Sequence, residues 1–468
     1  MLEGTVAAIA SAIRSRRLSP VEATEECLTR IRRLDDRLRA FITVNADGAL
    51  QTARTLEAEA AAGRFRGPLH GVPLAFKDLC HISGQPTSCG TKTVDYFVSP
   101  RDCEAARRLI AAGAVNLGKL NMSEIASGPF GDNPHHGDAQ NPWRLGHCAG
   151  GSSSGSGAAV AAGLAAGALG TDTGGSIRLP AGCCGVVGLK PTYGRVSRAG
   201  AMPLSWSLDH IGPLTLTVLD AAILLREMAG HDPYDATSSH HPVADYAAGL
   251  DEPIAGLRVG VPANYFFDGV DPEMEAGVRA AIDALARLGA RVTEITLPDP
   301  QALTDAANVI ARPEAASVHA RLITERPHEV GPAVRARTEQ GLRVLAHDYL
   351  AGLRVRAQLT REFITQVFDA VDVLVAPVIP EPAPALDVVK SGTVADIVGR
   401  MGRFSRLTRP INALGLPALA VPCGFSGAEL PLAVQIVGRP FDESTVLRVG
   451  HAYEQATEWH RRRPPLAS

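Results

Sequence analysis

The stretch from Gly150 to Pro180 constrains the fold more than any other part of the chain. It holds two clusters rich in glycine and serine, G-G-S-S-S-G-S-G and T-G-G-S, separated by a run of small residues from Ala158 to Leu169. That run predicts a buried, closely packed helix of about four turns, because glycine and alanine let neighbouring backbones approach. A helix of this kind would hold the two serine clusters at a fixed separation, which suits a nucleophile and its partner.

The second cluster can direct several backbone N–H groups toward one point. Glycine adopts conformations that other residues avoid, so Thr173, Gly174, Gly175 and Ser176 can form an oxyanion hole or an anion nest. A run rich in glycine and serine is otherwise typical of a turn or a linker. The apolar run between the two clusters favours a packed site over a linker.

Strand-like and helix-like patterns alternate along the chain without a clear linker, which predicts one large α/β unit. We expect a single domain over residues 1–468, with an N-terminal helical segment over about 1–65 and a charged helical insertion near the pocket over about 302–370. Helices are predicted at about 20–34, 47–62, 102–112, 218–228, 273–288 and 443–458. Strands are predicted at 41–44, 115–118, 185–190, 193–196, 257–261, 291–295, 371–377, 418–422 and 432–437.

Charge and cysteine usage narrow the class of protein. The net charge of −3 provides no electrostatic footprint for nucleic acid. The apolar run at 158–169 is too short to span a bilayer, and we expect no membrane association. The eight cysteines include no C-x-x-C pair, so we expect reduced, buried thiols and a cytoplasmic protein.

Lysine is scarce, which draws attention to each position where it occurs. Only five of the 46 basic residues are lysines, and four of these five lie between positions 77 and 190. Lys77 stands in the apolar run from His70 to Leu79. Apolar neighbours predict a desolvated amine with a lowered pKa, although an exposed strand end would also account for a lysine there.

The histidines are weaker candidates. His70 and His210 are each able to pair with a serine, but neither stands in a setting that marks it as a base. The adjacent pairs at 135–136 and 240–241 lack the spacing of a metal-ligand set. We therefore expect no metal and no cofactor.

The run from about Gly71 to Gly212 resembles the amidase signature family, and the similarity continues nearly to the C-terminus. The resemblance implies an α/β fold with a large mixed central sheet covered by helices on both faces. It also implies a Ser-Ser-Lys triad with Ser176 as the nucleophile, Ser152 as the bridging serine that follows a cis peptide bond, and Lys77 as the base.

In this triad Ser152 would pass a proton from Ser176 to Lys77 and return it to the leaving nitrogen. The backbone N–H groups at 173–176 would stabilise the oxyanion. We expect Asp172 and Arg178 to brace this loop, with a role for Arg178 in binding a substrate carboxylate as the alternative, and Ser153 to support the relay.

The resemblance implies a serine hydrolase that cleaves a carboxamide C–N bond of a small molecule through an acyl-enzyme. Three alternatives stay open: a carbamate or urea-type hydrolase, a glutaminase subunit of an amidotransferase, and a binding protein without activity, which an intact triad disfavours. A homodimer is left open. Substrate choice is expected to depend on residues 121–136, 193–206 and 302–350, with Met122, Phe130, Leu204 and Trp206 as candidate pocket walls.

Overall fold

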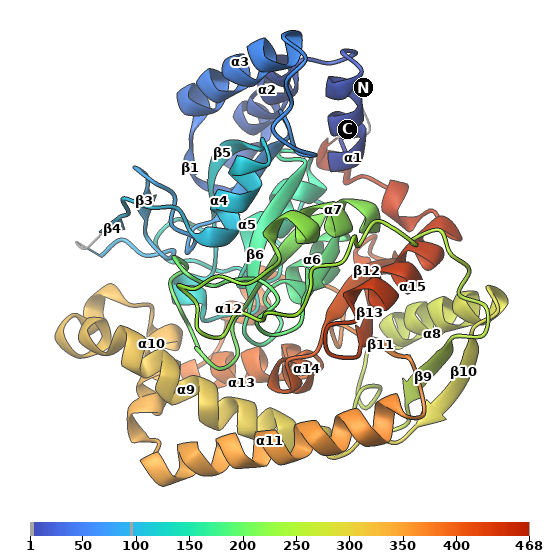
Figure 1. Ribbon diagram of the computed structural model, residues 1–468. Helices are drawn as coiled ribbons and strands as arrows, with labels where there is room; N and C mark the ends of the chain where they lie inside the picture. The colour runs from blue at the N-terminus through green and yellow to red at the C-terminus, as the bar shows by residue number, and fades with distance from the viewer. Residues whose placement is uncertain (1–3, 94–96, 468) are drawn as a thin grey trace.

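An eleven-stranded sheet runs through the centre of the computed structural model, in which the described residues are 4–93 and 97–467 (Figure 1). The first three residues of the predicted N-terminal segment lie outside the described residues. Parallel and antiparallel neighbours both occur, as in the parallel pair β2/β6 and the antiparallel pair β6/β8. In sheet order the strands are β1 (Phe41–Val44), β5 (Val115–Leu120), β2 (Pro73–Lys77), β6 (Gly167–Asp172), β8 (His210–Thr215), β7 (Val187–Lys190), β12 (Ala418–Phe425), β13 (Pro431–Gly438), β11 (Val373–Pro377), β9 (Arg258–Pro262) and β10 (Arg291–Ile295).

Helices flank this sheet, which confirms the predicted α/β class with a large mixed sheet. A separate two-stranded ribbon pairs β3 (Pro86–Thr87) with β4 (Phe97–Val98). The helices of the first half are α1 (Val6–Arg14), α2 (Pro20–Leu38), α3 (Ala46–Ala61), α4 (Glu104–Ala111), α5 (Ser154–Ala161), α6 (Arg178–Cys184) and α7 (Val218–Met228). Those of the second half are α8 (Pro272–Arg287), α9 (Pro300–Glu325), α10 (Pro332–Glu339), α11 (Ala346–Phe368), α12 (Leu386–Lys390), α13 (Val394–Phe404), α14 (Arg409–Leu414) and α15 (Glu443–Gln455).

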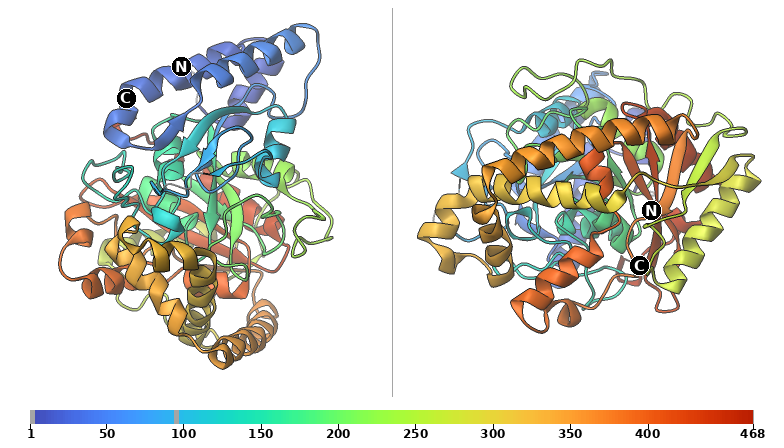
Figure 2. Two further views of the ribbon diagram at one scale, coloured as in Figure 1. Left: turned by 90° about the vertical axis from the view of Figure 1, so that its left-hand side faces the viewer. Right: turned by 90° about the horizontal axis from the view of Figure 1, so that it is seen from below.

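Two groups of helices occupy opposite ends of the molecule. Helices α1 to α3 lie at one end, and α9, α10 and α11 lie at the other, where α9 and α11 run side by side (Figures 1 and 2). Leu303 and Ile310 of α9 and Phe363 of α11 belong to a buried apolar cluster that continues onto β11 through Leu374. The predicted helical segment at about 302–370 is therefore observed as packed helices.

A local sequence signal accounts for the start of α2. A helix is predicted to begin at about residue 20, and the structure shows α2 beginning at Pro20 with a capping box between Ser19 and Glu22. The helix runs to Leu38 and ends with Arg39 in a left-handed conformation, four residues beyond the predicted end. The α7 and β10 boundaries match the prediction.

The small-residue run is not one helix, which corrects the prediction for residues 158–169. Helix α5 ends at Ala161, and Gly163 follows with φ of 66°, a left-handed conformation that glycine adopts at helix ends. The chain then turns and enters β6 at Gly167. Pairing with β2 on one side and β8 on the other favours the extended form over the helical preference of alanine.

Two further differences concern strands. Residues 193–196 form no strand within the described chain, and Val196 makes only an isolated bridge to Ala229. Conversely, β8 was not predicted, because its six residues His210–Thr215 include a glycine and a proline. Such residues are usually depleted in strands.

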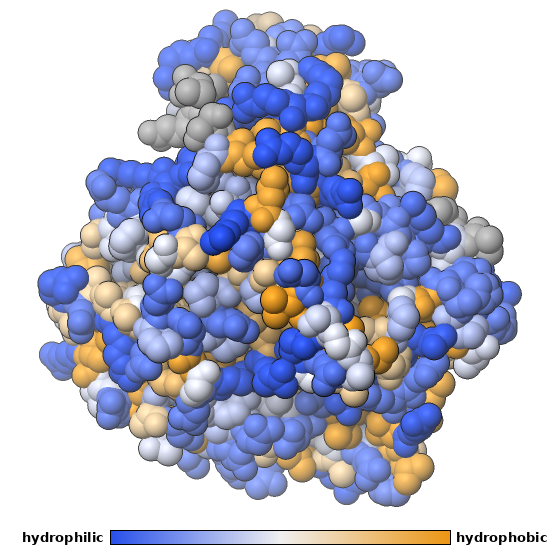
Figure 3. Space-filling view, turned by 180° about the vertical axis from the view of Figure 1, so that it is seen from behind, coloured by the Kyte–Doolittle hydropathy of each residue, from blue (hydrophilic) through white to orange (hydrophobic). Residues whose placement is uncertain are grey.

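The buried thiols agree with the prediction, since all eight cysteines are free and buried. Hydrophilic residues cover much of the face shown in Figure 3, with apolar residues interspersed among them. Within residues 4–93 and 97–467, no helix combines the length and the apolar character needed to cross a membrane.

Candidate active site

Lys77 is the last residue of β2, next to the carboxyl end of β6. The two strands are parallel neighbours, so their carboxyl ends meet at one edge of the sheet. Lys77 Nζ donates a hydrogen bond to Ser152 Oγ at 2.7 Å and another to Thr171 Oγ1 at 2.8 Å. The lysine therefore joins the first serine cluster to the strand that leads into the second.

The surroundings of Lys77 disfavour a charged amine. Its side chain has no exposed surface, and among the described residues no carboxylate forms an ion pair with it. Burial lowers the pKa of Lys77 from its usual 10.5 to about 8. This agrees with the desolvation predicted for Lys77 and excludes an exposed strand end, and a sizeable share of the amine is neutral near pH 8.

The first serine cluster lies in the turn that leads into α5. The Gly151–Ser152 peptide bond is cis, as the family resemblance implies. Ser152 is fully buried. Ser153 links the two clusters, since its N–H donates to Ser176 O at 3.3 Å and its Oγ contacts the backbone of Thr171 at 3.2 Å.

The second cluster forms the loop between β6 and α6. Among the hydrogen bonds of the described chain, none uses the N–H of Thr173, Gly174 or Ser176. The N–H of Gly175 donates to Asp172 Oδ1 at 2.7 Å. Gly175, which was expected to donate to the oxyanion, thus has its N–H engaged within the loop, and the remaining three N–H groups are the candidate donors.

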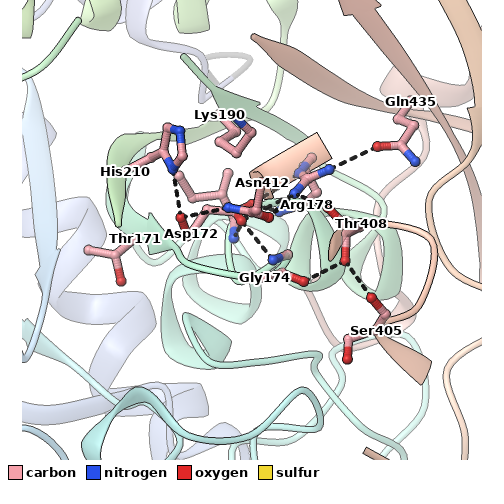
Figure 4. A network of polar contacts seen from close by, with 12 residues as sticks. Thr171, Asp172, Gly174, Arg178, Lys190, His210, Ser405, Thr408, Asn412 and Gln435 are labelled. Carbon is pink, nitrogen blue, oxygen red and sulfur yellow. Dashed lines mark hydrogen bonds and ion pairs between the residues drawn. The ribbon is translucent and has the colours of Figure 1, made fainter. Parts of the chain in front are cut away.

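A buried ion pair holds this loop in place. Arg178 Nε lies 3.0 Å from Asp172 Oδ2, and both side chains are fully buried. Burial raises the pKa of Asp172, but the Arg178 guanidinium outweighs burial and holds that pKa well below the usual range. Arg178 also donates to Gln435 Oε1 and to Asn412 Oδ1 (Figure 4). The contacts of Arg178 are structural, and its carboxylate partner is Asp172.

Thr408 fixes the same loop from the C-terminal half of the chain. Its Oγ1 donates to Gly174 O at 2.6 Å (Figure 4). Gly175 has a φ of 132°, and a Cβ at this position would overlap with Thr408 Oγ1. The close approach of Thr408 therefore requires glycine at position 175.

Two cavities meet at this loop, and both include Thr173 in their walls. The first, of about 250 Å³, extends past Leu204 and Asp209 to the exposed side chains of Trp206 and Tyr234. The second, of about 70 Å³, contains Ser176 and Gly174 in its wall. Ser176 is partly exposed, whereas Lys77 and Ser152 are buried, so Ser176 is the hydroxyl that a ligand in the second cavity reaches.

All three segments expected to shape the pocket contribute to these walls. The second cavity is lined by residues from 126–129, by Leu204 and Leu208, and by Ala307, Asn308, Ala311 and Arg337. Leu204 and Trp206 line cavities, as predicted. Met122 and Phe130, the other two candidate walls, belong to the buried core instead.

The histidines considered as bases bond elsewhere. His70 accepts from the Arg66 N–H and contacts Leu56 O. His210 Nδ1 lies 2.7 Å from Leu208 O and 3.1 Å from Asp172 O, and burial lowers the pKa of this imidazole well below its usual value (Figure 4). Across the described ranges no three His, Cys, Asp or Glu side chains are grouped to hold a metal ion.

Sequence reasoning missed several residues of the site. Thr171 stands one position before Asp172 in the recognised motif, and its position at a strand end beside Lys77 was the available signal. Thr408, Arg337 and Arg409 carry no local signal, since they lie more than 150 residues from Ser176 in sequence. Only the tertiary fold brings these three to the loop.

The chain is similar to known amidases and amidotransferase subunits over most of its length. The Amidase family matches residues 22–447. The chain is 44% identical to a glutamyl-tRNA(Gln) amidotransferase subunit of Roseiflexus sp. (strain RS-1), over 96% of this chain and 95% of that protein. Among solved structures, the chain is similar to one from a vestigial protein complex that reveals the evolutionary origins of an s-triazine catabolic enzyme. The two are 36% identical with a TM-score of 0.90, and the match covers 96% of this chain and 98% of that chain.

A further solved structure extends over the whole length. The chain aligns with a 6-aminohexanoate cyclic dimer hydrolase at 30% identity and a TM-score of 0.90, covering 100% of both chains. Sequence and fold therefore agree over nearly the full length. The chain belongs to the amidase signature family and is an enzyme that acts on amide carbon–nitrogen bonds.

Proposed function

We propose that this chain hydrolyses small carboxamides through an acyl-enzyme, with Ser176 as nucleophile, Ser152 as proton relay and Lys77 as base. The observation that carries the proposal is the 2.7 Å contact between the buried Lys77 amine and Ser152 Oγ. It supplies a base at one end of the relay, and the partly exposed Ser176 stands at the other.

The first half of the reaction forms an ester. Neutral Lys77 accepts the Ser152 hydroxyl proton while Ser152 accepts the proton of Ser176, whose Oγ attacks the amide carbon. The free N–H groups of Thr173, Gly174 and Ser176 stabilise the oxyanion. As the intermediate collapses, the C–N bond breaks and the leaving nitrogen takes a proton from Ser152, which Lys77 replenishes.

The second half returns the enzyme to its starting state. A water molecule gives a proton to the relay and attacks the ester carbon, and the acyl group leaves as a carboxylic acid while Ser176 regains its hydroxyl proton. The proton count balances because Lys77 both receives and returns one proton in each half. Asp172 and Arg178 act through the loop geometry and Ser153 through its bonds to the two clusters.

A glutaminase subunit is the second candidate, and the sequence relatives favour it over a free-standing amidase. Relatives named as glutamyl-tRNA(Gln) amidotransferase subunits are 41% to 44% identical over nearly the whole chain. Such a role would require a partner chain and glutamine as substrate. A carbamate or urea-type substrate would use the same relay. We further propose a cytoplasmic protein with one domain, and a homodimer if it acts without other chains.

The test is hydrolysis by the purified chain alone, with primary amides, anilides, carbamates and glutamine as substrates. Ser176→Ala is the inactive variant, and Ser11→Ala, a change at an exposed serine of α1, is the matched control. We expect turnover by the parent and the control only. Turnover restricted to glutamine, or appearing only with a partner chain, would favour the glutaminase subunit. Undiminished turnover by Ser176→Ala would overturn the proposal.

A further inference from the structure

Three arginines line a passage from the protein surface to the candidate oxyanion loop. Arg409, at the start of α14, and Arg337, on α10, line the cavity that contains Ser176. Both also line an adjoining cavity of about 80 Å³, where the exposed Arg312 of α9 joins them. The two cavities share five residues, including Asn308, and are therefore continuous.

Arg409 lies beside the loop. A Cβ placed on Gly174 would lie 3.6 Å from Arg409 Cγ, an ordinary contact distance. The guanidinium is held by neutral groups, with Nη1 donating to Asn308 Oδ1 at 2.6 Å and Nε to Ser405 Oγ at 3.0 Å. These bonds leave Nη2 of the guanidinium available to a ligand.

No carboxylate compensates this positive charge. Within residues 4–93 and 97–467, none of the three guanidinium groups has an ion pair with Asp or Glu, and neither cavity wall contains an acidic residue. Burial, followed by repulsion from Arg337 and Arg312, lowers the pKa of Arg409. Cations withdrawn from water are usually paired, so the unpaired guanidinium groups of the partly buried Arg337 and Arg409 beside one cavity favour an anion from outside.

We infer that the substrate is a carboxamide with a short arm that ends in a carboxylate, and that Arg409 and Arg337 bind this carboxylate. The inference rests on the proposed function and names its substrate class. Arginine suits the role because its planar donor fork matches a carboxylate. Arg312, at the outer end, adds positive potential along the entry route. The small volume beside Ser176 restricts the arm to a few carbons.

The same walls disfavour a substrate that also carries an ammonium group close to the carboxylate. Neither the cavity that contains Ser176 nor the adjoining 80 Å³ cavity has an acidic side chain in its wall. Asp209, in the wall of the 250 Å³ cavity, already accepts hydrogen bonds from Thr173 Oγ1 and from the N–H groups of Leu204 and Ser205. The three arginines repel an ammonium group. A free-standing amidase with this anion site and a glutaminase subunit would therefore prefer different substrates. Glutamine has both a carboxylate and an ammonium group, whereas glutaramate is the same amide without the ammonium group.

The experiment compares glutaramate, pentanamide and glutamine as substrates of the full chain. Pentanamide matches glutaramate in length but is neutral. A hydrogen bond to a charged group changes a binding constant by about 10- to 100-fold. We therefore expect kcat/KM for glutaramate to exceed that for pentanamide by about this factor. We also expect kcat/KM for glutaramate to exceed that for glutamine.

Two variants test the assignment of residues. In Arg337→Gln and Arg409→Gln we expect the ratio of glutaramate to pentanamide to fall at least about tenfold. Arg354→Gln, at an exposed arginine of α11, is the matched control and keeps the ratio. The Arg337 guanidinium makes no hydrogen bond within the described chain, so Arg337→Gln preserves folding better than Arg409→Gln, and Arg409→Lys serves as a milder second change.

Binding of glutarate, measured by calorimetry, separates failure of this inference from failure of the proposed function. Glutarate carries two carboxylates and has no amide to cleave. Binding that is lost in Arg337→Gln supports the anion site even if no amide is hydrolysed. Hydrolysis of pentanamide with no preference for glutaramate and no glutarate binding would overturn the anion site and leave the hydrolase standing. Preference for glutamine over glutaramate would overturn the exclusion of the ammonium group.

Discussion

Replacing Lys77 with methionine should abolish activity and at the same time stabilise the folded protein at neutral pH. The side chain is fully buried, and its pKa falls from 10.5 in an exposed lysine to about 8. One unit of pKa corresponds to about 1.4 kcal/mol, so the buried amine costs the folded state about 3 kcal/mol near pH 7. Losing two hydrogen bonds to Ser152 and Thr171 offsets about 2 kcal/mol of that.

The pH dependence gives the sign of the effect. Below about pH 8 the unfolded chain and the folded chain both hold the proton, and the full cost applies. Between about pH 8 and 10.5 only the unfolded chain holds it, so the stability of the parent rises with pH relative to Lys77→Met. From about pH 7 to 9.5 the difference in unfolding free energy should move by about 2 kcal/mol in favour of the parent.

Urea unfolding followed by tryptophan fluorescence at several pH values measures this difference. Subtracting the variant from the parent cancels the titration of the other groups. Lys92→Met, a change at an exposed lysine, is the control and should give a difference that does not vary with pH. A constant difference for Lys77→Met as well would show that Lys77 keeps an ordinary pKa and that no neutral base is available near pH 8.

Three other changes test separate parts of the site. The kcat/KM of the parent should fall about tenfold per pH unit below about pH 8, because only neutral Lys77 accepts a proton; a flat profile with chemistry limiting would contradict this. Thr171→Val removes one hydrogen bond to Lys77 Nζ and should lower kcat/KM about 5- to 10-fold without loss of fold, as circular dichroism would show. Arg178→Met leaves the buried Asp172 carboxylate unpaired and should cost about 3–5 kcal/mol in urea unfolding, and Asp172→Asn in the same chain should recover part of it.

The parts of the fold that local sequence determines were predicted well. The start of α2 near residue 20, helix α7 and strand β10 follow from side-chain periodicity and from helix-capping residues. The run from Ala158 to Leu169 was wrong as a single helix because alanine and glycine fit either state, and the pairing of β6 between two strands settled the outcome. Strand order is non-local in the same way, and periodicity carries no information about it.

In the candidate site too, the residues within local motifs were predictable, whereas the contacts between distant segments were not. The lysine and the two serine clusters are visible in sequence because each lies in a local motif, and the lowered pKa of Lys77 followed from its apolar neighbours. The availability of each loop N–H depends on hydrogen bonds that no motif specifies, such as that from Gly175 to Asp172. The arginines come from α9, α10 and α14, and only their shared cavity reveals a common role.

Trapping the acyl-enzyme tests whether Ser176 is the nucleophile. The parent is mixed with an anilide or ester substrate, quenched with acid, digested and analysed by mass spectrometry. We expect an added acyl mass on Ser176, which is absent in Ser176→Ala and retained in Ser11→Ala. Turnover with no covalent adduct at any time point, or an adduct on another residue, would contradict it.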